Sequence, residues 1–163
     1  MITMLHKTGI PTEDLVLSRF PEPSILLKPK AVLECYEDIP CNPCATSCPF
    51  QAIDIGANIN KQPKLNPDLC TGCGLCVPSC PGLAIVIAQL KGEEAYFKIP
   101  YEFHPFPEKH DVWDGVNRKG EVICDAKIEH VLISKSNDHT AIITVSVPKA
   151  YLYEFITIRG RHE

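Results

Sequence analysis

Several features that mark large protein classes are missing from this sequence. No stretch of its 163 residues approaches the run of about 18 apolar residues that a membrane-spanning helix needs. It contains no G-x-G-x-x-G motif after a strand, no P-loop and no G-x-S-x-G motif, and nothing pairs a nucleophile with a base. The sequence therefore predicts no membrane span, no dinucleotide site of its own and no catalytic centre.

Charge of one sign is not concentrated in any part of the chain. Residues 1–90 carry 6 basic and 8 acidic side chains and residues 91–163 carry 10 and 12, so each part contributes −2 to the net charge of −4. This balance offers no basic stripe to nucleic acid. Residues 1–10 also lack the apolar segment of a secretory signal, so we expect a cytoplasmic protein.

Cysteine, in contrast, is abundant and clustered. Cys70, Cys73, Cys76 and Cys80 form a C-x₂-C-x₂-C-x₃-C run followed by Pro81. This spacing is typical of bacterial [4Fe–4S] ligation, in which three cysteines bind one cluster and the fourth binds its neighbour. Disulfides are not favoured without an oxidising compartment, and zinc sites use two separated C-x₂-C pairs. The run therefore predicts iron–sulfur chemistry, which moves electrons one at a time.

A second copy of the motif precedes this run. Cys41, Cys44 and Cys48 lie 32 residues before Cys73, Cys76 and Cys80. The similarity continues beyond the cysteines, since residues 48–53 read CPFQAI and residues 80–85 read CPGLAI. A repeat at a fixed offset indicates a duplicated structural unit.

The first copy departs from the pattern at its first ligand. The repeat would place a cysteine at position 38, which is Asp38, and the nearest candidate is Cys35 on a loop that is three residues longer. We predict two [4Fe–4S] clusters, one on Cys35, Cys41, Cys44 and Cys80 and the other on Cys70, Cys73, Cys76 and Cys48. An acidic ligand from Asp38, or a three-iron cluster, is the alternative for the first of them.

The patterns around the cysteines predict an α+β fold in three parts. Residues 1–30 form an N-terminal extended arm, in which Thr12 caps a short helix that runs to Arg19; the arm either frays or wraps a partner. Residues 31–90 form the ferredoxin-like two-[4Fe–4S] module, with small helices after Cys41 and Cys73. Residues 91–163 form a small β-rich domain.

Alternating apolar and polar residues predict the strands of this last part. Residues 122–129 and 141–147 each place one face in the core, and residues 95–99 form a further strand that ends at Pro100. The expected result is a small antiparallel sheet or partly closed barrel of about four to six strands, which could include a strand over 84–88. On this pattern Cys124 is a buried structural thiol and Trp113 a core residue.

A family resemblance extends these predictions. Residues 35–88 resemble a bacterial-type ferredoxin domain with two [4Fe–4S] clusters. Residues 34–44, 114–122 and 145–148 are similar to the small ferredoxin-like subunits of FAD-dependent dehydrogenase complexes that oxidise amino acids or amines such as proline, hydroxyproline or sarcosine. The resemblance implies a partner subunit that carries the FAD, and often a [2Fe–2S] subunit as well.

We therefore expect an electron-transfer subunit of a hetero-oligomeric oxidoreductase, not an enzyme by itself. It would relay single electrons between its two clusters and a partner's flavin. The first alternative is a free-standing ferredoxin that diffuses between enzymes, and the second is an interaction or sensor module with purely structural clusters. Oxidised clusters of about −2 each would make the first half more acidic and favour basic partners.

Overall fold

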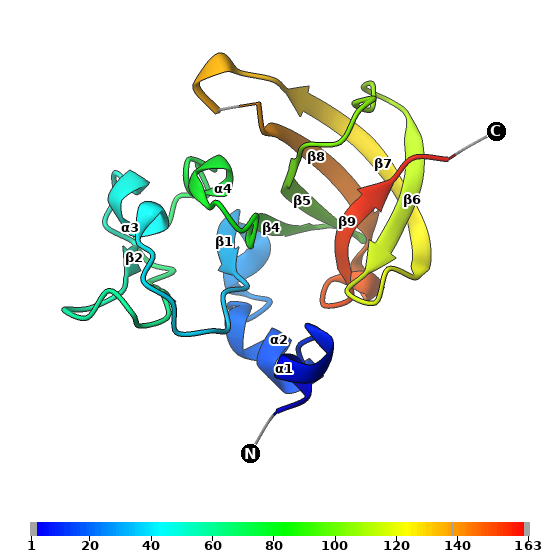
Figure 1. Cartoon of the computed structure of the whole chain (residues 1–163). Coiled ribbons are helices and arrows are strands. Elements are labelled where there is room, and N and C mark those ends of the chain that lie inside the picture. Colours follow the sequence, from blue (N-terminus) through cyan, green and yellow to red (C-terminus); the bar gives the residue numbers. More distant parts are fainter. Residues whose placement is uncertain (1–2, 138, 162–163) are drawn as a thin grey trace.

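The computed structural model describes residues 3–137 and 139–161 of the chain (Figure 1). Helices are few and short. The α-helices are α1 (Met4–Thr8), α2 (Glu13–Arg19), α3 (Pro43–Ser47) and α4 (Cys76–Ser79), and the 3₁₀ helices are η1 (Ile25–Leu27), η2 (Lys135–Asn137) and η3 (Lys149–Tyr151). In the part of the chain that the structure describes, no helix has the length and apolarity needed to cross a membrane.

Most of the described residues that lie in helices or strands belong to antiparallel strands. The strands are β1 (Lys30–Leu33), β2 (Ile53–Asp54), β3 (Lys64–Leu65), β4 (Ile85–Lys91), β5 (Glu94–Tyr101), β6 (Val112–Asn117), β7 (Val122–Leu132), β8 (Ala141–Pro148) and β9 (Phe155–Arg159). Seven of them form one open sheet in the order β1-β4-β5-β8-β7-β6-β9, and β2 pairs with β3 alone. The α+β fold with an antiparallel sheet after the cysteine region is confirmed, and so is the sharing of the strand over 84–88.

Strands β1 and β4 lie between two hydrophobic cores and contribute side chains to both. Along β1, Ala31 and Leu33 face the cysteines whereas Val32 packs into the core of the large sheet. The same alternation in β4 sends Ile87 to the cysteines and Ala88 to the sheet core. Because successive side chains of a strand point to opposite faces, burial on both faces explains the uninterrupted apolar runs in these strands. Strand β4 continues to Lys91 and therefore crosses the predicted boundary between residues 90 and 91. The three-part division of the chain stays a prediction.

The large sheet curls around its own core. Phe97 of β5 and Phe155 of β9 have ring centroids 4.9 Å apart, although three strands separate β5 from β9 in the sheet order. Trp113 packs on the same core and lies edge-on to Tyr101 at 6.0 Å, as expected for a core residue. The sheet therefore resembles the predicted partly closed barrel in its curvature but stays open.

Parts of the segment from residue 3 to residue 30 pack against the rest of the chain. Helix α2 begins after Thr12, whose side chain accepts a hydrogen bond from the Leu15 N–H at 3.4 Å, which confirms the predicted cap. Val16 of α2 and Leu26 of η1 are buried, and Leu26 belongs to the sheet core. In Figure 1, α1 and α2 lie below the sheet and the cysteine region.

Two details of the strand predictions are wrong. Strand β5 does not end before Pro100 but continues to Tyr101, because Pro100 pairs with Ile142 on one side and its other side lies beyond the pairing with β4. Strand β8 is buried on both faces rather than one: Ile142 joins the core around the cysteines, and Ser146 donates to Glu129 Oε1 at 2.8 Å.

Candidate iron–sulfur site

Eight of the nine cysteines surround two separate hollows. The first hollow is bordered by the first cysteine set, Cys35, Cys41, Cys44 and Cys80. The other is bordered by the second cysteine set, Cys48, Cys70, Cys73 and Cys76. The structure thus brings together both groups of four that the spacing predicts, including the exchange of Cys48 and Cys80 between the two copies of the motif.

The two copies of the motif have the same backbone geometry in the residues that follow the exchanged cysteines. The N–H of Ala52 donates to Cys48 Sγ at 3.4 Å, and the N–H of Ala84 donates to Cys80 Sγ at the same distance. In both copies the residue just before this alanine has a φ of 52°. Since these positions are 32 residues apart, the sequence repeat is also a structural repeat, and the predicted helices after Cys41 and Cys73 are confirmed as α3 and α4.

The second set is held by close backbone packing. Gly72, with φ of 71°, lies so close to Pro29 that an added Cβ would stand 2.6 Å from its carbonyl oxygen. Only glycine fits this position without strain. The Lys30 ammonium donates to the Cys70 carbonyl at 2.6 Å, and the Ala31 N–H donates to Cys70 Sγ at 3.4 Å. Lys30 therefore fixes the start of the cysteine run, a role that spacing alone does not reveal.

Asp38 and Cys35 are in different environments. Cys35 borders the first hollow, whereas Asp38 is not among the residues that line it. The Asp38 carboxylate instead accepts hydrogen bonds from Lys61 Nζ and from Gln62 Nε2, each at 3.2 Å. This geometry favours Cys35 over Asp38 as the fourth ligand of the first set.

Burial and mutual repulsion oppose ionisation of these thiols. Burial, followed by the charges of the other three cysteines of the second set, raises the pKa of Cys76 to about 12. The pKa of Cys44 is raised mainly by burial, and its charged neighbours are the other three cysteines of the first set. Four adjacent thiolates therefore need a strongly positive group to bind, as the irons of a cluster provide.

The surroundings of both hollows suit an iron–sulfur cluster. Ala31, Ile53 and Ile87 line the second hollow, and Ala84 and Ile85 line the first, so the walls are largely apolar. Within the described residues, no three Cys, His, Asp or Glu side chains converge as they would around a single metal ion. A [4Fe–4S] cluster held by each set would supply one-electron transfer.

Comparison with known proteins agrees with this geometry. Residues 39–84 match the family model of the 4Fe-4S dicluster domain. The chain belongs to the proteins that carry a 4Fe-4S dicluster domain. This domain implies two [4Fe–4S] clusters and a ferredoxin-type role in electron transfer. Cys35 lies just outside the matched residues, in keeping with its longer loop.

The relatives match the chain over little more than a third of its length. The ferredoxin-type protein NapF of Escherichia coli (strain K12) is 40% identical over 57 residues, which are 34% of this chain and 35% of NapF. The pyruvate synthase subunit PorD of Methanothermobacter marburgensis is 34% identical over 62 residues, which are 38% of this chain and 69% of PorD. The match therefore spans only about a third of NapF. No solved structure matches the chain significantly.

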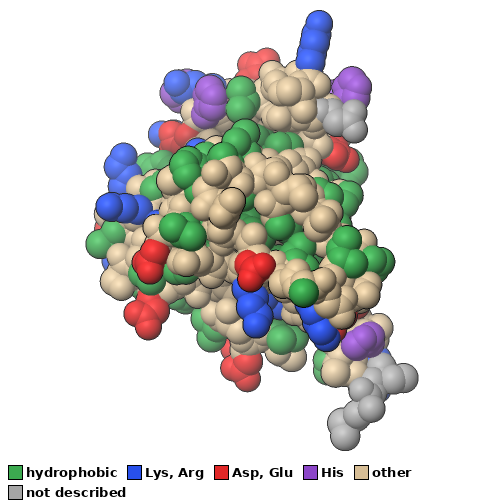
Figure 2. All heavy atoms as spheres, turned by 90° about the vertical axis from the view of Figure 1, so that its left-hand side faces the viewer, with side chains coloured by type: hydrophobic (Ala, Val, Ile, Leu, Met, Phe, Trp, Pro, Cys, Tyr) green, Lys and Arg blue, Asp and Glu red, His purple; other side chains and the backbone are tan. Residues whose placement is uncertain are grey.

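The segment from residue 39 to residue 84, which borders both hollows, carries few charged side chains. Residues 39–84 contain two acidic and two basic residues, Asp54, Asp68, Lys61 and Lys64. Large apolar side chains are exposed instead, namely Ile39, Phe50, Ile59, Leu69, Leu75 and Leu83. Figure 2 shows this face, on which hydrophobic and uncharged groups predominate. Three further acidic residues of the predicted 31–90 module, Glu34, Glu37 and Asp38, lie just before this segment, next to Cys35 in the chain.

The remaining candidate residues lie away from both hollows. Cys124 is half-buried against the sheet core, close to Gly115, which agrees with a structural thiol. His104 stacks on Phe106 with ring centroids 4.4 Å apart. Neither these residues nor His110 line the hollows.

Sequence reasoning also missed a buried ion pair beside the first set. Arg118, on the turn between β6 and β7, forms a two-pronged ion pair with Glu34, the residue before Cys35. Their side chains are 11% and 8% exposed. Residues 84 positions apart in the chain carry no local signal of such a contact.

Proposed function

We propose that this chain is the electron-transfer subunit of an oxidoreductase complex, in which it relays single electrons between its two clusters and the flavin of a partner subunit. The observation that carries the proposal is the pair of four-cysteine sets linked by exchanged cysteines. Two clusters can match the two-electron chemistry of a flavin in sequential single steps. The family resemblance favours an amino-acid or amine dehydrogenase as the partner.

The surface around the clusters supports a docked subunit over a diffusing carrier. A carrier that meets several enzymes gains from charge, which speeds encounter and leaves contacts weak. Here the surface offers exposed apolar side chains such as Phe50 and Leu75, with few charges. Exposed apolar groups on one face are typical of surfaces that a partner covers. PorD is itself named as a subunit of an enzyme.

The proposal is tested by anaerobic purification of the chain from its native cells, with iron and flavin measured in the eluate. We expect about eight irons per chain, because each of two clusters holds four, together with stoichiometric FAD on a larger co-eluting subunit. Addition of that subunit's substrate should bleach the iron–sulfur absorbance. A loaded chain that elutes alone, without flavin, would instead favour the free-standing ferredoxin.

A cysteine substitution distinguishes electron transfer through the clusters from a purely structural role of the clusters. Cys73→Ala removes an exposed ligand of the second set. In the purified complex we expect this variant to leave the flavin reducible by substrate but to block electron transfer to an external acceptor. Full transfer in the variant would show that the second cluster does not conduct.

A further inference from the structure

Cys35 is carried by a loop that the sequence repeat does not specify. Residues 36–40 separate it from Cys41, whereas only two residues separate Cys70 from Cys73. The short loop of the second set is positioned by Gly72 and its contact with Pro29. The longer loop has no glycine and needs another anchor to hold Cys35 at the first hollow.

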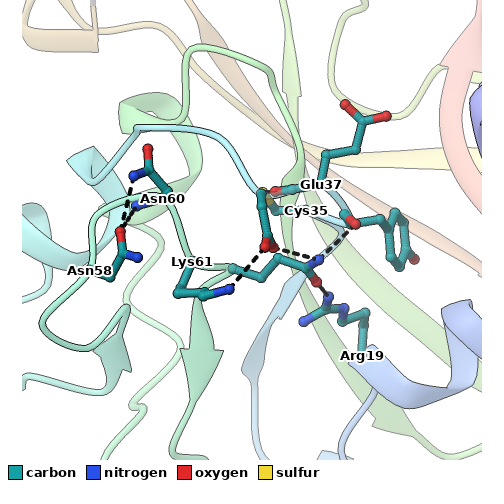
Figure 3. Close-up of polar contacts among 9 residues, drawn as sticks. Arg19, Cys35, Glu37, Asn58, Asn60 and Lys61 are labelled. Atoms are coloured by element: carbon teal, nitrogen blue, oxygen red, sulfur yellow. Dashed lines mark hydrogen bonds and ion pairs between the residues drawn. The ribbon is translucent and has the colours of Figure 1, made fainter.

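Gln62 provides that anchor, within the group of polar contacts drawn around Arg19 and Lys61 in Figure 3. Its Nε2 donates to the Tyr36 carbonyl at 2.8 Å and to Asp38 Oδ1 at 3.2 Å, so one amide group contacts the loop at two points. The neighbouring Lys61 Nζ donates to the second carboxylate oxygen of Asp38 at 3.2 Å. These contacts hold the Asp38 carboxylate away from the first hollow, which Asp38 does not line.

Arg19 orients Gln62 in turn. The Arg19 guanidinium donates to Gln62 Oε1 and to the Pro63 carbonyl, the latter at 3.4 Å, and lies 5.3 Å from the ring centroid of Tyr36. Because the Gln62 amide oxygen accepts a hydrogen bond from Arg19, the amide nitrogen is oriented toward the loop that carries Cys35. Arg19 belongs to α2, so the N-terminal segment contributes to the order of the first hollow.

We propose that Gln62, oriented by Arg19, is the positioning residue for the first cluster, and that it holds the loop so that Cys35 rather than Asp38 is the fourth ligand. The proposal rests on the assignment of Cys35 as a ligand. It gives the residues between the two motifs a task that their polar, proline-rich sequence does not suggest. It also gives the N-terminal segment a role inside the chain.

The test uses the full chain, loaded with iron and sulfide under anaerobic conditions. Ferricyanide removes one electron from an oxidised [4Fe–4S] cluster, one ferrous iron leaves, and a three-iron centre remains, which electron paramagnetic resonance detects. In Gln62→Ala we expect this centre to form about fivefold faster, the factor to which one net hydrogen bond corresponds. Gln62→Glu, which keeps an acceptor for Arg19 but has no donor for the loop, should behave in the same way.

Asn60→Ala is the matched control, because Asn60 lies on the same segment but bonds only to Asn58 among the described residues. We expect it to match the parent chain. Parent-like rates in both Gln62 variants would overturn the proposal. Full iron content in Cys35→Ala would overturn the ligand assignment beneath it, and neither result depends on whether a flavoprotein partner exists.

Discussion

The backbone N–H of Ala31 donates to Cys70 Sγ at 3.4 Å, so the first strand of the sheet contacts a cysteine of the second set directly. Cys48, also of the second set, accepts a similar bond from Ala52, whereas the first set receives one such bond among the described residues, from Ala84 to Cys80. Hydrogen bonds to sulfur favour the reduced, more negative form of a cluster. The two clusters should therefore differ in reduction potential.

We expect the cluster on the second set to be reduced first. One additional hydrogen bond of about 1 kcal/mol corresponds to about 40 mV for a one-electron couple. An anaerobic redox titration followed by electron paramagnetic resonance measures both potentials. Cys73→Ser identifies the second cluster, since its loss should remove the higher-potential step. Loss of the lower-potential step in this variant would contradict the assignment.

Gly72→Ala should prevent stable loading of the second set. The new Cβ would stand 2.6 Å from Pro29 on a backbone with φ of 71°, so we expect a loss of more than about 2 kcal/mol. Gly92→Ala is the matched control, because Gly92 also has a positive φ, of 62°, but nothing lies within 4 Å of its Cβ position. Iron content and anaerobic thermal melting compare the two variants. Equal iron content in both would show that the contact with Pro29 does not matter.

Arg118→Ala should destabilise the chain more than any change to a surface ion pair. It leaves the Glu34 carboxylate, 8% exposed, without its partner, and breaking a buried pair in this way typically costs about 3–5 kcal/mol. Lys149→Ala removes the exposed pair with Glu93, for which we expect at most about 1 kcal/mol. Thermal melting of the loaded chain measures both. Similar melting temperatures would show that Glu34 is not effectively buried.

The thiol of Cys124 should react slowly and only at high pH. Burial, followed by the charges of Asp125 and Glu154, raises its pKa to about 11. A raised pKa keeps the thiol protonated below that value, so only about one molecule in a thousand carries the reactive thiolate at pH 8. Alkylation by iodoacetamide, followed by mass spectrometry of the loaded chain, should therefore accelerate steadily from pH 8 to pH 10. Rapid labelling at pH 8 would contradict this.

The parts of the fold that depend on local chemistry were predictable from the sequence. Cysteine spacing grouped the two sets, since the number of residues between ligands limits how the backbone can surround a cluster. Thr12 marked the start of α2 because a threonine cap needs only its own turn. Alternation along β8 identified its inner face, where Ala141, Ile143 and Val145 are fully buried.

The parts that depend on distant residues were not predictable. From the sequence alone, Pro100 is expected to end its strand because proline has no backbone N–H to donate. In the structure, however, Pro100 lies beyond the residues of β5 that pair with β4, so no hydrogen bond to β4 is lost. The choice between Cys35 and Asp38 depends on Gln62, 24 residues beyond Asp38. The low charge of residues 39–84 was hidden by averaging over residues 1–90, because the acidic residues of that half lie mostly outside 39–84.

The central claim is that eight cysteines hold two [4Fe–4S] clusters that carry electrons. It is tested most directly by the iron and sulfide content of the anaerobic chain, read together with the electron paramagnetic resonance spectrum after full reduction. The account predicts about eight irons and eight sulfides per chain, because each cluster holds four of each, and a spectrum broadened by coupling between two nearby reduced clusters. About four irons per chain, or the spectrum of one isolated cluster, would contradict it.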